Sequence, residues 1–428
     1  MQIQSKFLRA LSHRQSLRNV LFVPLWVCAF IWRRLMFRTT FITVTGSVGK
    51  STATASLATV LSANAPTNWV PGGRNNRFVV AQAILQTRFR HRFTVIEVGT
   101  RKPGDIRRAG RLIAPDIVLM LRVLHLHSDV FPTLEEMASE KEQLLNYIPK
   151  RGAAILNADD PLVMAMRSRW PGQVRTFGIT PDNFVTFSEV SSQWPQRLTF
   201  RLHHGDSSTS VETNLAGEHL LTSTVGAAAT AVFCGVPLPT LAEGLLKVQP
   251  LPARMQPMQL PNGAVVLRDD FNASMSTFQA ALTVLRAAES VRRIAIVDEM
   301  LDTGLASDER ALLLGQLVAA ASDIAVFVGE HSHMSMKAAV ASGLNCESVF
   351  AFQDMSEAAA FLGEELRRGD LVLLKGSIGR HIERLVLAQL GSVSCWVVRC
   401  PKQILCEDCP ELKLVSIAPA GKLVAQEF

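Results

Sequence analysis

One segment near the amino terminus places a short apolar strand, a glycine-rich turn and a helix in direct succession. Residues 41–45 read Phe-Ile-Thr-Val-Thr, and apolar residues recur at helical spacing from Thr52 to Leu61. Between them lies the turn Gly46-Ser47-Val48-Gly49-Lys50-Ser51-Thr52. The backbone N–H groups of such a turn and the N-terminus of the helix bind phosphate. The order predicts the start of a parallel α/β domain with a nucleotide phosphate site, where Lys50 meets the β and γ phosphates and Ser51 meets Mg²⁺.

The spacing of the glycines narrows the class of nucleotide-binding protein. Only two residues separate Gly46 from Gly49. The phosphate loop of kinases and GTPases has four residues between its glycines. The shortened turn therefore points away from those enzymes, although a P-loop kinase or NTPase stays an alternative.

Further apolar runs fit buried strands that alternate with helices. In the first half they lie at residues 93–98, 117–121 and 153–156, with a helical pattern at 134–147. After a proline-containing linker at 247–252 a second series follows at 264–267, 294–297, 324–328 and 371–374. This alternation is typical of doubly wound sheets. The expected fold is α/β, with a central P-loop ATPase domain whose sheet is mostly parallel and a C-terminal Rossmann-like α/β domain.

The expected division of the chain follows from these patterns. At 428 residues, two or three domains are favoured over a single core. The boundaries expected are a basic and apolar N-terminal segment at 1–40, the central domain at 41–248, the C-terminal α/β domain at 253–392 and a cysteine-containing tail at 393–428.

The N-terminal segment contains an apolar run from Val20 to Trp32 with basic residues on both sides. A membrane span needs about 20 residues, so this run is short. We expect a helix that is either buried against the first domain or lying at a membrane surface through residues 14–38, where Trp26, Trp32 and the arginines suit an interface. A true span is the remaining alternative.

Composition excludes some classes of function. The formal net charge is +7, but apart from the first 40 residues the basic side chains are scattered, which argues against a nucleic-acid-binding protein. Seven cysteines in a chain of this length do not resemble a secreted disulfide framework. A cytoplasmic protein, with membrane association through the N-terminal segment as a further possibility, and a monomer are expected.

Two charged residues, one at the end of an expected strand and one on an expected helix, are candidates for the site. Glu97 ends the apolar stretch 94–97, which places a carboxylate at the C-terminal edge of the sheet, where Mg²⁺ requires oxygen ligands. A capping or surface carboxylate is the alternative for Glu97. Lys141 lies in Ser139-Glu140-Lys141-Glu142, and its chemistry alone favours a solvent-exposed helix face.

Further short motifs follow the phosphate loop in a fixed order. They are Asn75-Asn76, Glu97-Val98-Gly99, Pro103-Gly104-Asp105-Ile106, His127, Lys141, Asn157-Ala158-Asp159-Asp160-Pro161, Gly217-Glu218-His219, Arg254, Asp269, Phe271-Asn272-Ala273 and Lys375-Gly376-Ser377. Together with the shortened loop they resemble the Mur ligases, most closely the members that add D-alanyl-D-alanine. The resemblance covers about residues 41–390.

The resemblance implies roles for residues that their spacing alone does not assign. It places Glu97 and His127 at metal ions, although His125 lies two residues from His127 and a structural histidine is the alternative. It implies that Lys141 is carbamylated and faces Mg²⁺. The remaining roles it implies are nucleotide contacts by Asn157, Asp159, Arg254 and Asp269, and substrate contacts by Asn75, Asn76, Asn272, Lys375 and Ser377. For Lys375 a surface lysine at a strand end is the alternative.

Several positions depart from the family pattern. Arg122, Ser223 and Ile378 replace an asparagine, an asparagine and an arginine of the family, and Ser274-Met275 replaces Asn-Pro. Only 40 residues precede the first strand, where the D-alanyl-D-alanine-adding members carry a UDP-sugar-binding domain. We therefore expect the usual nucleotide-sugar acceptor to lack its binding domain.

The predicted function is an ATP-dependent, ADP-forming ligase that joins a small-molecule or peptide carboxylate to an amine through an acyl phosphate, with ATP and Mg²⁺. A catalytically retired scaffold is a second alternative, motivated by Arg122, Ser223 and Ile378. In the tail, Cys395, Cys400, Cys406 and Cys409 suggest zinc, but only Cys406 and Cys409 have ligand spacing, so zinc is not favoured.

Overall fold

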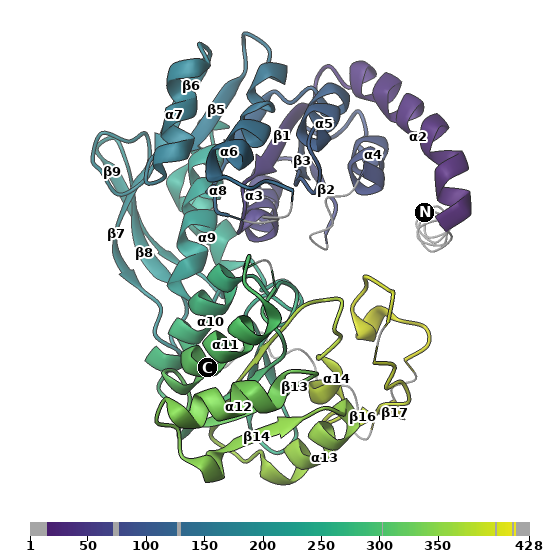
Figure 1. Ribbon diagram of the computed structural model, residues 1–428. Coiled ribbons are helices and arrows are strands. Elements are labelled where there is room, and N and C mark those ends of the chain that lie inside the picture. The colour runs from purple at the N-terminus through teal and green to yellow at the C-terminus, as the bar shows by residue number, and fades with distance from the viewer. Residues whose placement is uncertain are drawn as a thin grey trace.

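Two α/β units follow one another along the chain, each built on a six-stranded sheet, and they form the upper and lower halves of Figure 1. The computed structural model describes residues 15–71, 77–125, 130–301, 303–398, 400–412 and 415–416. The α/β fold with two successive sheets agrees with the sequence prediction.

The first sheet has the order β2-β3-β1-β4-β5-β6, and every pairing in it is parallel. Its strands are β1 (Thr40–Thr45), β2 (Thr67–Trp69), β3 (Phe93–Glu97), β4 (Ile117–Met120), β5 (Ala153–Asn157) and β6 (Gln173–Phe177). Because β1 lies between β3 and β4, the loops that follow these three strands meet at one edge of the sheet.

Helices cover both faces of this sheet, as the alternation along β1 requires. Ile42 and Val44 pack in one apolar cluster, and Phe41 packs in another on the opposite face. The first cluster includes α3 (Lys50–Asn64), α8 (Leu221–Phe233) and α9 (Leu238–Leu246). The second includes α2 (Gln15–Leu35), α4 (Arg77–Gln86), α5 (Asp105–Ile113), α6 (Leu134–Glu142) and α7 (Pro161–Arg169).

A small antiparallel sheet that the sequence did not predict lies between β6 and α8. It consists of β7 (Thr186–Ser191), β8 (Thr199–His204) and β9 (Ser207–Glu212). Phe200, Leu202 and Val211 face inward and join the cluster around α3 and α8. This sheet forms the side of the upper unit in Figure 1.

The second sheet is mixed, with the order β10-β11-β15-β12-β13-β14. Its strands are β10 (Gln256–Gln259), β11 (Val265–Asp269), β12 (Arg292–Val297), β13 (Ile324–Val328), β14 (Val349–Phe352) and β15 (Asp370–Lys375). Only β10 runs antiparallel to its neighbour, at one edge of this sheet. The helices are α10 (Met275–Ala287), α11 (Ser307–Ala319) and α12 (Ser332–Ala341) on one face, and α13 (Met355–Glu365) and α14 (Arg384–Leu387) on the other. A short pair, β16 (Gly391–Ser392) and β17 (Val415–Ser416), follows.

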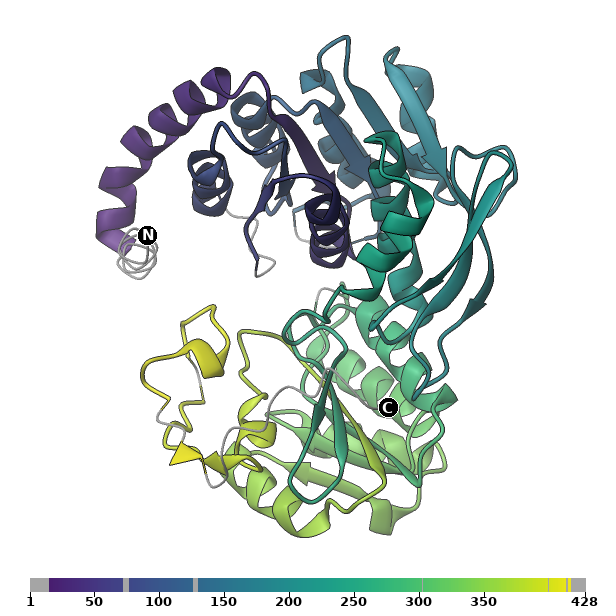
Figure 2. The same ribbon diagram turned by 180° about the vertical axis from the view of Figure 1, so that it is seen from behind.

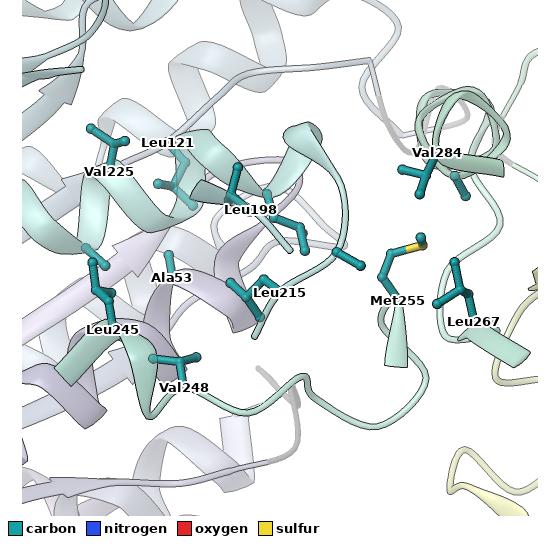
Figure 3. Packing of buried hydrophobic residues seen from close by; sticks show 14 of the residues in the cluster. Ala53, Leu121, Leu198, Leu215, Val225, Leu245, Val248, Met255, Leu267 and Val284 are labelled. Atoms are coloured by element: carbon teal, nitrogen blue, oxygen red, sulfur yellow. The ribbon is translucent and has the colours of Figure 1, made fainter. Parts of the chain in front are cut away.

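The two units share one apolar cluster. Figure 3 shows Leu198 and Leu215 of the first unit together with Met255, Leu267 and Val284 of the second, all of which belong to this cluster. The Glu289 N–H donates to the Trp194 carbonyl oxygen at 2.9 Å, which adds a backbone link between the units. The shared cluster and this hydrogen bond join the two units, which lie next to each other in both views of the ribbon (Figures 1 and 2).

From Val23 onward, helix α2 packs on the first unit with one face and exposes large apolar side chains on the other. The Trp32 indole N–H donates to the Thr87 carbonyl oxygen at 2.8 Å, and Arg33 forms an ion pair with Asp116 at 3.1 Å. The helix predicted for this segment is therefore present and docked. Among the helices within the described ranges, none combines the length and the apolar character that crossing a membrane requires.

Candidate active site

The glycine-rich turn between β1 and α3 has a backbone that only glycine adopts easily. Gly49 has φ +77°, and a Cβ there would lie 2.1 Å from the Ser223 hydroxyl oxygen of α8. The Ser47 N–H donates to the Arg122 carbonyl oxygen at 2.6 Å, so the turn is tied to the segment after β4. Helix α3 begins at Lys50, and its N-terminus is directed at the turn as phosphate binding requires.

Lys50 is folded back onto the turn. Its Nζ donates to the carbonyl oxygens of Gly46 at 2.9 Å and Ser47 at 2.8 Å. Burial lowers the pKa of Lys50 from its ordinary value of 10.5; Glu97 opposes this shift and Arg254 adds to it. The ammonium therefore lies where a bound phosphate would compete with the two carbonyl oxygens.

Ser51 and Glu97 form an oxygen-only pair at the ends of neighbouring elements. The Ser51 hydroxyl donates to Glu97 Oε2 at 2.8 Å. Glu97 ends β3, whose register sets it beside Val44 of β1. A hydroxyl and a carboxylate are ligand types that Mg²⁺ prefers, so these residues fit the ion predicted for them. His127, the third predicted ligand, lies outside the described residues.

Lys141 is buried, so the solvent-exposed position that its chemistry alone favoured is wrong. The side chain extends from α6, and its Nζ donates to the Gly46 carbonyl oxygen at 3.1 Å. Its neighbour Glu140 is also buried and accepts from the N–H groups of Gly104 and Ile106, each at 3.0 Å. Burial lowers the pKa of Lys141 well below 10.5, Lys50 lowers it further, and Glu140 opposes the shift.

Arg254 brings a cation from the second unit to the same place. Its guanidinium carbon lies 4.1 Å from the centre of the Phe271 ring. Burial lowers the pKa of Arg254, and the carboxylates of Glu97 and Asp269 oppose the shift, so the cation lies between carboxylates of both units. The residues on either side of Arg254, Ala253 at φ +58° and Met255 at φ +47°, are both held in the left-handed region. Backbone strain of this kind concentrates at functional sites.

Lys375 is also buried, so a surface lysine at the end of β15 is wrong. Its Nζ forms an ion pair with Asp269 Oδ2 at 3.1 Å and donates to the Asp269 carbonyl oxygen at 3.1 Å and to the Asn272 carbonyl oxygen. Burial lowers the pKa of Lys375, and Asp269 opposes this shift most strongly. Asp269 Oδ1 also accepts from the Met255 N–H at 3.2 Å, so this pair supports the turn that carries Arg254.

Comparison with known proteins identifies the family to which this chain belongs. The Mur ligase middle domain matches residues 44–231, and the glutamate ligase domain of Mur ligases matches residues 253–378. The chain belongs to the Mur ligase family. The predictions of the family, of its α/β fold and of its ligase class are confirmed.

Curated relatives and solved structures show how far the similarity extends. The chain is 28% identical over 380 residues to the UDP-N-acetylmuramoyl-tripeptide--D-alanyl-D-alanine ligase of Mycobacterium tuberculosis, a match that covers 84% of this chain and 74% of the relative. The corresponding enzyme of Escherichia coli is 26% identical and is covered to 80%, with 85% of this chain aligned. A crystal structure of MurF from Acinetobacter baumannii superimposes with a TM-score of 0.77 at 26% identity, covering 85% of this chain and 79% of that one.

The Asn-Ala-Asp-Asp turn of this Mur ligase follows β5 and holds the segment after β4 in place. Asn157 Oδ1 accepts from the Asp159 N–H at 3.1 Å, and Asp159 Oδ1 accepts from the Ile179 N–H at 2.9 Å. The buried Nδ2 of Asn157 has no partner within the described residues, so it can donate to a ligand. Asp160, to which the sequence assigned no role, accepts from the Val123 N–H at 2.8 Å and caps α7.

The remaining predicted site residues either lie outside the described part of the chain or make hydrogen bonds to residues close in the sequence. Asn75 and Asn76, like His127, lie outside the described residues. The Asn272 side chain accepts from the Ser274 N–H at 3.3 Å, and the Ser377 carbonyl oxygen accepts from the Arg380 N–H at 2.9 Å.

Two of the departures from the Mur ligase pattern, Arg122 and Ser223, lie close to the phosphate loop, and a third, Ile378, lies in the second unit. Ser223 lies against Gly49, and Arg122 contributes its carbonyl oxygen to Ser47. The Ile378 N–H donates to the Phe271 carbonyl oxygen at 3.2 Å, next to the ring on which Arg254 rests. The contacts of Ser223 with the loop and of Ile378 with Phe271 could not be predicted, because each joins residues far apart in the sequence.

Proposed function

We propose that this Mur ligase joins a carboxylate to an amine, with ATP as the phosphoryl donor and ADP and phosphate as products. The observation that carries the proposal is the meeting of Lys50, Lys141 and Glu97 of the first unit with Arg254 of the second. Two cations, Lys50 and Arg254, with one carboxylate and the Lys141 amine at a phosphate loop suit transfer of a phosphoryl group, which needs positioning and charge neutralisation.

The steps follow from the chemistry of an amide ligase. A carboxylate oxygen of the first substrate attacks the γ-phosphorus of ATP, and the bond to ADP breaks. The amine nitrogen then attacks the acyl carbon, phosphate leaves, and the amine loses a proton. Lys50 would leave the carbonyl oxygens of Gly46 and Ser47 for the phosphates, and Arg254 would neutralise charge from the opposite side.

Mg²⁺ would supply further neutralisation, held by Ser51 and Glu97. Lys141 would supply a negative group to this site. Its buried amine, with its lowered pKa, can react as the free base with CO₂ to form a carbamate and release one proton. His127 remains the third proposed Mg²⁺ ligand, after Ser51 and Glu97.

The experiment that tests this function measures ADP release with a panel of carboxylates and amines. One substrate pair in the panel is taken from the names of the relatives: a UDP-N-acetylmuramoyl tripeptide with D-alanyl-D-alanine. We expect ADP release to require both an acid and an amine. Release without the amine would favour a P-loop NTPase or kinase, and nucleotide binding without turnover on any pair would favour a retired scaffold.

We also propose that helix α2 rests on an anionic lipid surface. Large apolar side chains cover its outer face: Val23, Val27, Phe30, Ile31 and Leu35. The Arg34 guanidinium carbon lies 3.5 Å from the centre of the Phe30 ring, so a cation is placed on this apolar face. Apolar side chains can enter the boundary between lipid headgroups and acyl chains, and arginine among them can pair with anionic headgroups.

A further inference from the structure

We propose that His381, Glu383 and Cys406 form a zinc-binding site that fixes the cysteine-containing tail to the second unit. One ligand atom from each of these three buried residues lies within 4.8 Å of the other two. His381 and Glu383 lie between β15 and α14, whereas Cys406 belongs to the tail. All three lie beyond residue 378, where the match to the Mur ligase domains ends.

The separations among these atoms suit tetrahedral zinc. Two ligands about 2.0–2.3 Å from a zinc ion at a tetrahedral angle lie about 3.3–3.8 Å apart. His381 Nδ1 lies 3.3 Å from Glu383 Oε1 and 3.5 Å from Cys406 Sγ. Nitrogen, oxygen and sulfur donors together favour zinc over Mg²⁺ or Ca²⁺, which prefer oxygen alone.

The surroundings orient each ligand as metal sites require. His381 Nε2 lies 3.0 Å from the Lys402 carbonyl oxygen, which can accept only an N–H, so Nε2 carries a proton and Nδ1 faces the cluster. The Cys406 N–H donates to Glu383 Oε1 at 2.9 Å, and Arg384 Nε donates to Cys406 Sγ at 3.3 Å. The arginine is placed to stabilise a thiolate.

Two further observations favour a cation at this cluster. Glu383 is fully buried, and its Oε2 has no hydrogen-bond partner within the described residues. A buried carboxylate oxygen without a partner is costly. Three carboxylates and two guanidinium groups lie at this cluster, so one negative charge is not balanced. The carboxylates are those of Asp270, Glu383 and Glu407, and the guanidinium groups are those of Arg268 and Arg384. Zn²⁺ together with ionised Cys406 balances this group.

The sequence could not reveal this site because its ligands do not follow a short motif. Cys406 and Cys409 have ligand spacing, but the Cys409 Sγ accepts from Lys402 Nζ at 3.6 Å and is not one of the three grouped ligands. The partners of Cys406 lie more than twenty residues earlier in the chain.

The test is the zinc content of the full-length protein after dialysis against a weak chelator, measured by plasma mass spectrometry. We expect one zinc ion per chain in the wild type, and its loss in Cys406→Ser and His381→Asn. Asn suits position 381 because the backbone there has φ +58°, which Asn tolerates better than most residues. Cys409→Ser and Cys346→Ser are the matched controls, since one lies outside the cluster and the other is exposed, and both should keep zinc.

A second measurement separates metal loss from misfolding. Cobalt loading of the wild type should give a thiolate-to-cobalt charge-transfer band, and Cys406→Ser should lack it while keeping the wild-type circular dichroism spectrum. Chelation should lower the melting temperature of the wild type and leave that of Cys406→Ser unchanged. Equal zinc content in the wild type and Cys406→Ser, or no zinc in wild type loaded with Zn²⁺, would overturn the proposal. Loss of zinc in Cys409→Ser would overturn the three-ligand assignment.

Discussion

Lys50 and Lys141 donate to the same atom, the carbonyl oxygen of Gly46, at 2.9 and 3.1 Å. Two ammonium groups at one acceptor repel each other, and each lowers the proton affinity of a close neighbour. Lys141 is the more deeply buried of the two, and its pKa is the one that lies well below the ordinary value. The pair is therefore best described as one cation that meets phosphate and one amine that can lose its proton.

Lys50→Ala should strongly reduce ADP release and leave the fold intact. Within the described part of the chain, the Lys50 ammonium donates only to loop carbonyl oxygens, so its loss removes a phosphate ligand and no apolar contact made by that group. We expect turnover to fall by about 100- to 1000-fold, the effect of removing one preorganised donor. Lys150→Ala is the control, because Lys150 is exposed. Wild-type turnover in Lys50→Ala with an unchanged circular dichroism spectrum would refute the phosphate-loop assignment.

Activity should depend on bicarbonate and on pH through Lys141. A carbamate forms only from the neutral amine, so turnover should fall as pH drops through the lowered pKa of Lys141 and as bicarbonate is removed. Lys141→Ala should be nearly inactive, and a short carboxylic acid in solution should restore part of the activity.

The same pKa shift has a consequence for stability in protein kept free of CO₂. The folded pKa of Lys141 lies below the unfolded value, so the unfolded chain binds more protons and the free energy of unfolding should rise with pH between the two values. Lys141→Met should lose this part of the pH dependence in urea unfolding. Full activity of Lys141→Ala without bicarbonate would show that the carbamate is not needed.

The order of elements around the loop could be predicted from the sequence, because strand, glycine turn and helix are local signals. The β7–β9 sheet could not: Ser207–Glu212 is largely polar, and its pairing partners are fixed only by tertiary structure. The burial of Lys141 could not be predicted from the sequence either. A run of charged residues predicts a solvent-exposed face unless it is known that Glu140 is held by Gly104 and Ile106 across the fold.

Arg254→Lys should reduce turnover even though lysine keeps the positive charge. The planar guanidinium rests on the Phe271 ring, and a lysine ammonium cannot keep that stacking and present several donors at once. We expect turnover to fall by about 100-fold with little change in melting temperature. Arg167→Lys, at an exposed position, is the matched control. If Arg254→Lys retains wild-type turnover, Arg254 does not contact the transferred phosphoryl group.

Lys375→Met should destabilise the second unit. It removes the cation of a buried pair and leaves Asp269 without its partner, a loss of about 3 kcal/mol in the free energy of unfolding. Adding Asp269→Asn should recover part of this loss, because the unpaired charge is removed. Urea unfolding of the single and double variants measures both values. An unchanged free energy in Lys375→Met, with a raised KM for the amine, would instead assign Lys375 to substrate binding.

Helix α2 should bind vesicles that contain anionic lipid. Its outer face carries Val27 and Ile31, which are 50% and 55% exposed, and placing glutamate at both positions opposes insertion and adds repulsion from the headgroups. The wild type should co-sediment with anionic vesicles, less at high salt because exposed charges are screened, and the double variant Val27→Glu/Ile31→Glu should stay in the supernatant. Val291→Glu is the matched control, since Val291 is 79% exposed but lies in the second unit, away from α2. If the double variant sediments as the wild type does, the outer face of α2 is not the lipid contact; if the wild type stays in the supernatant, this face contacts something other than lipid.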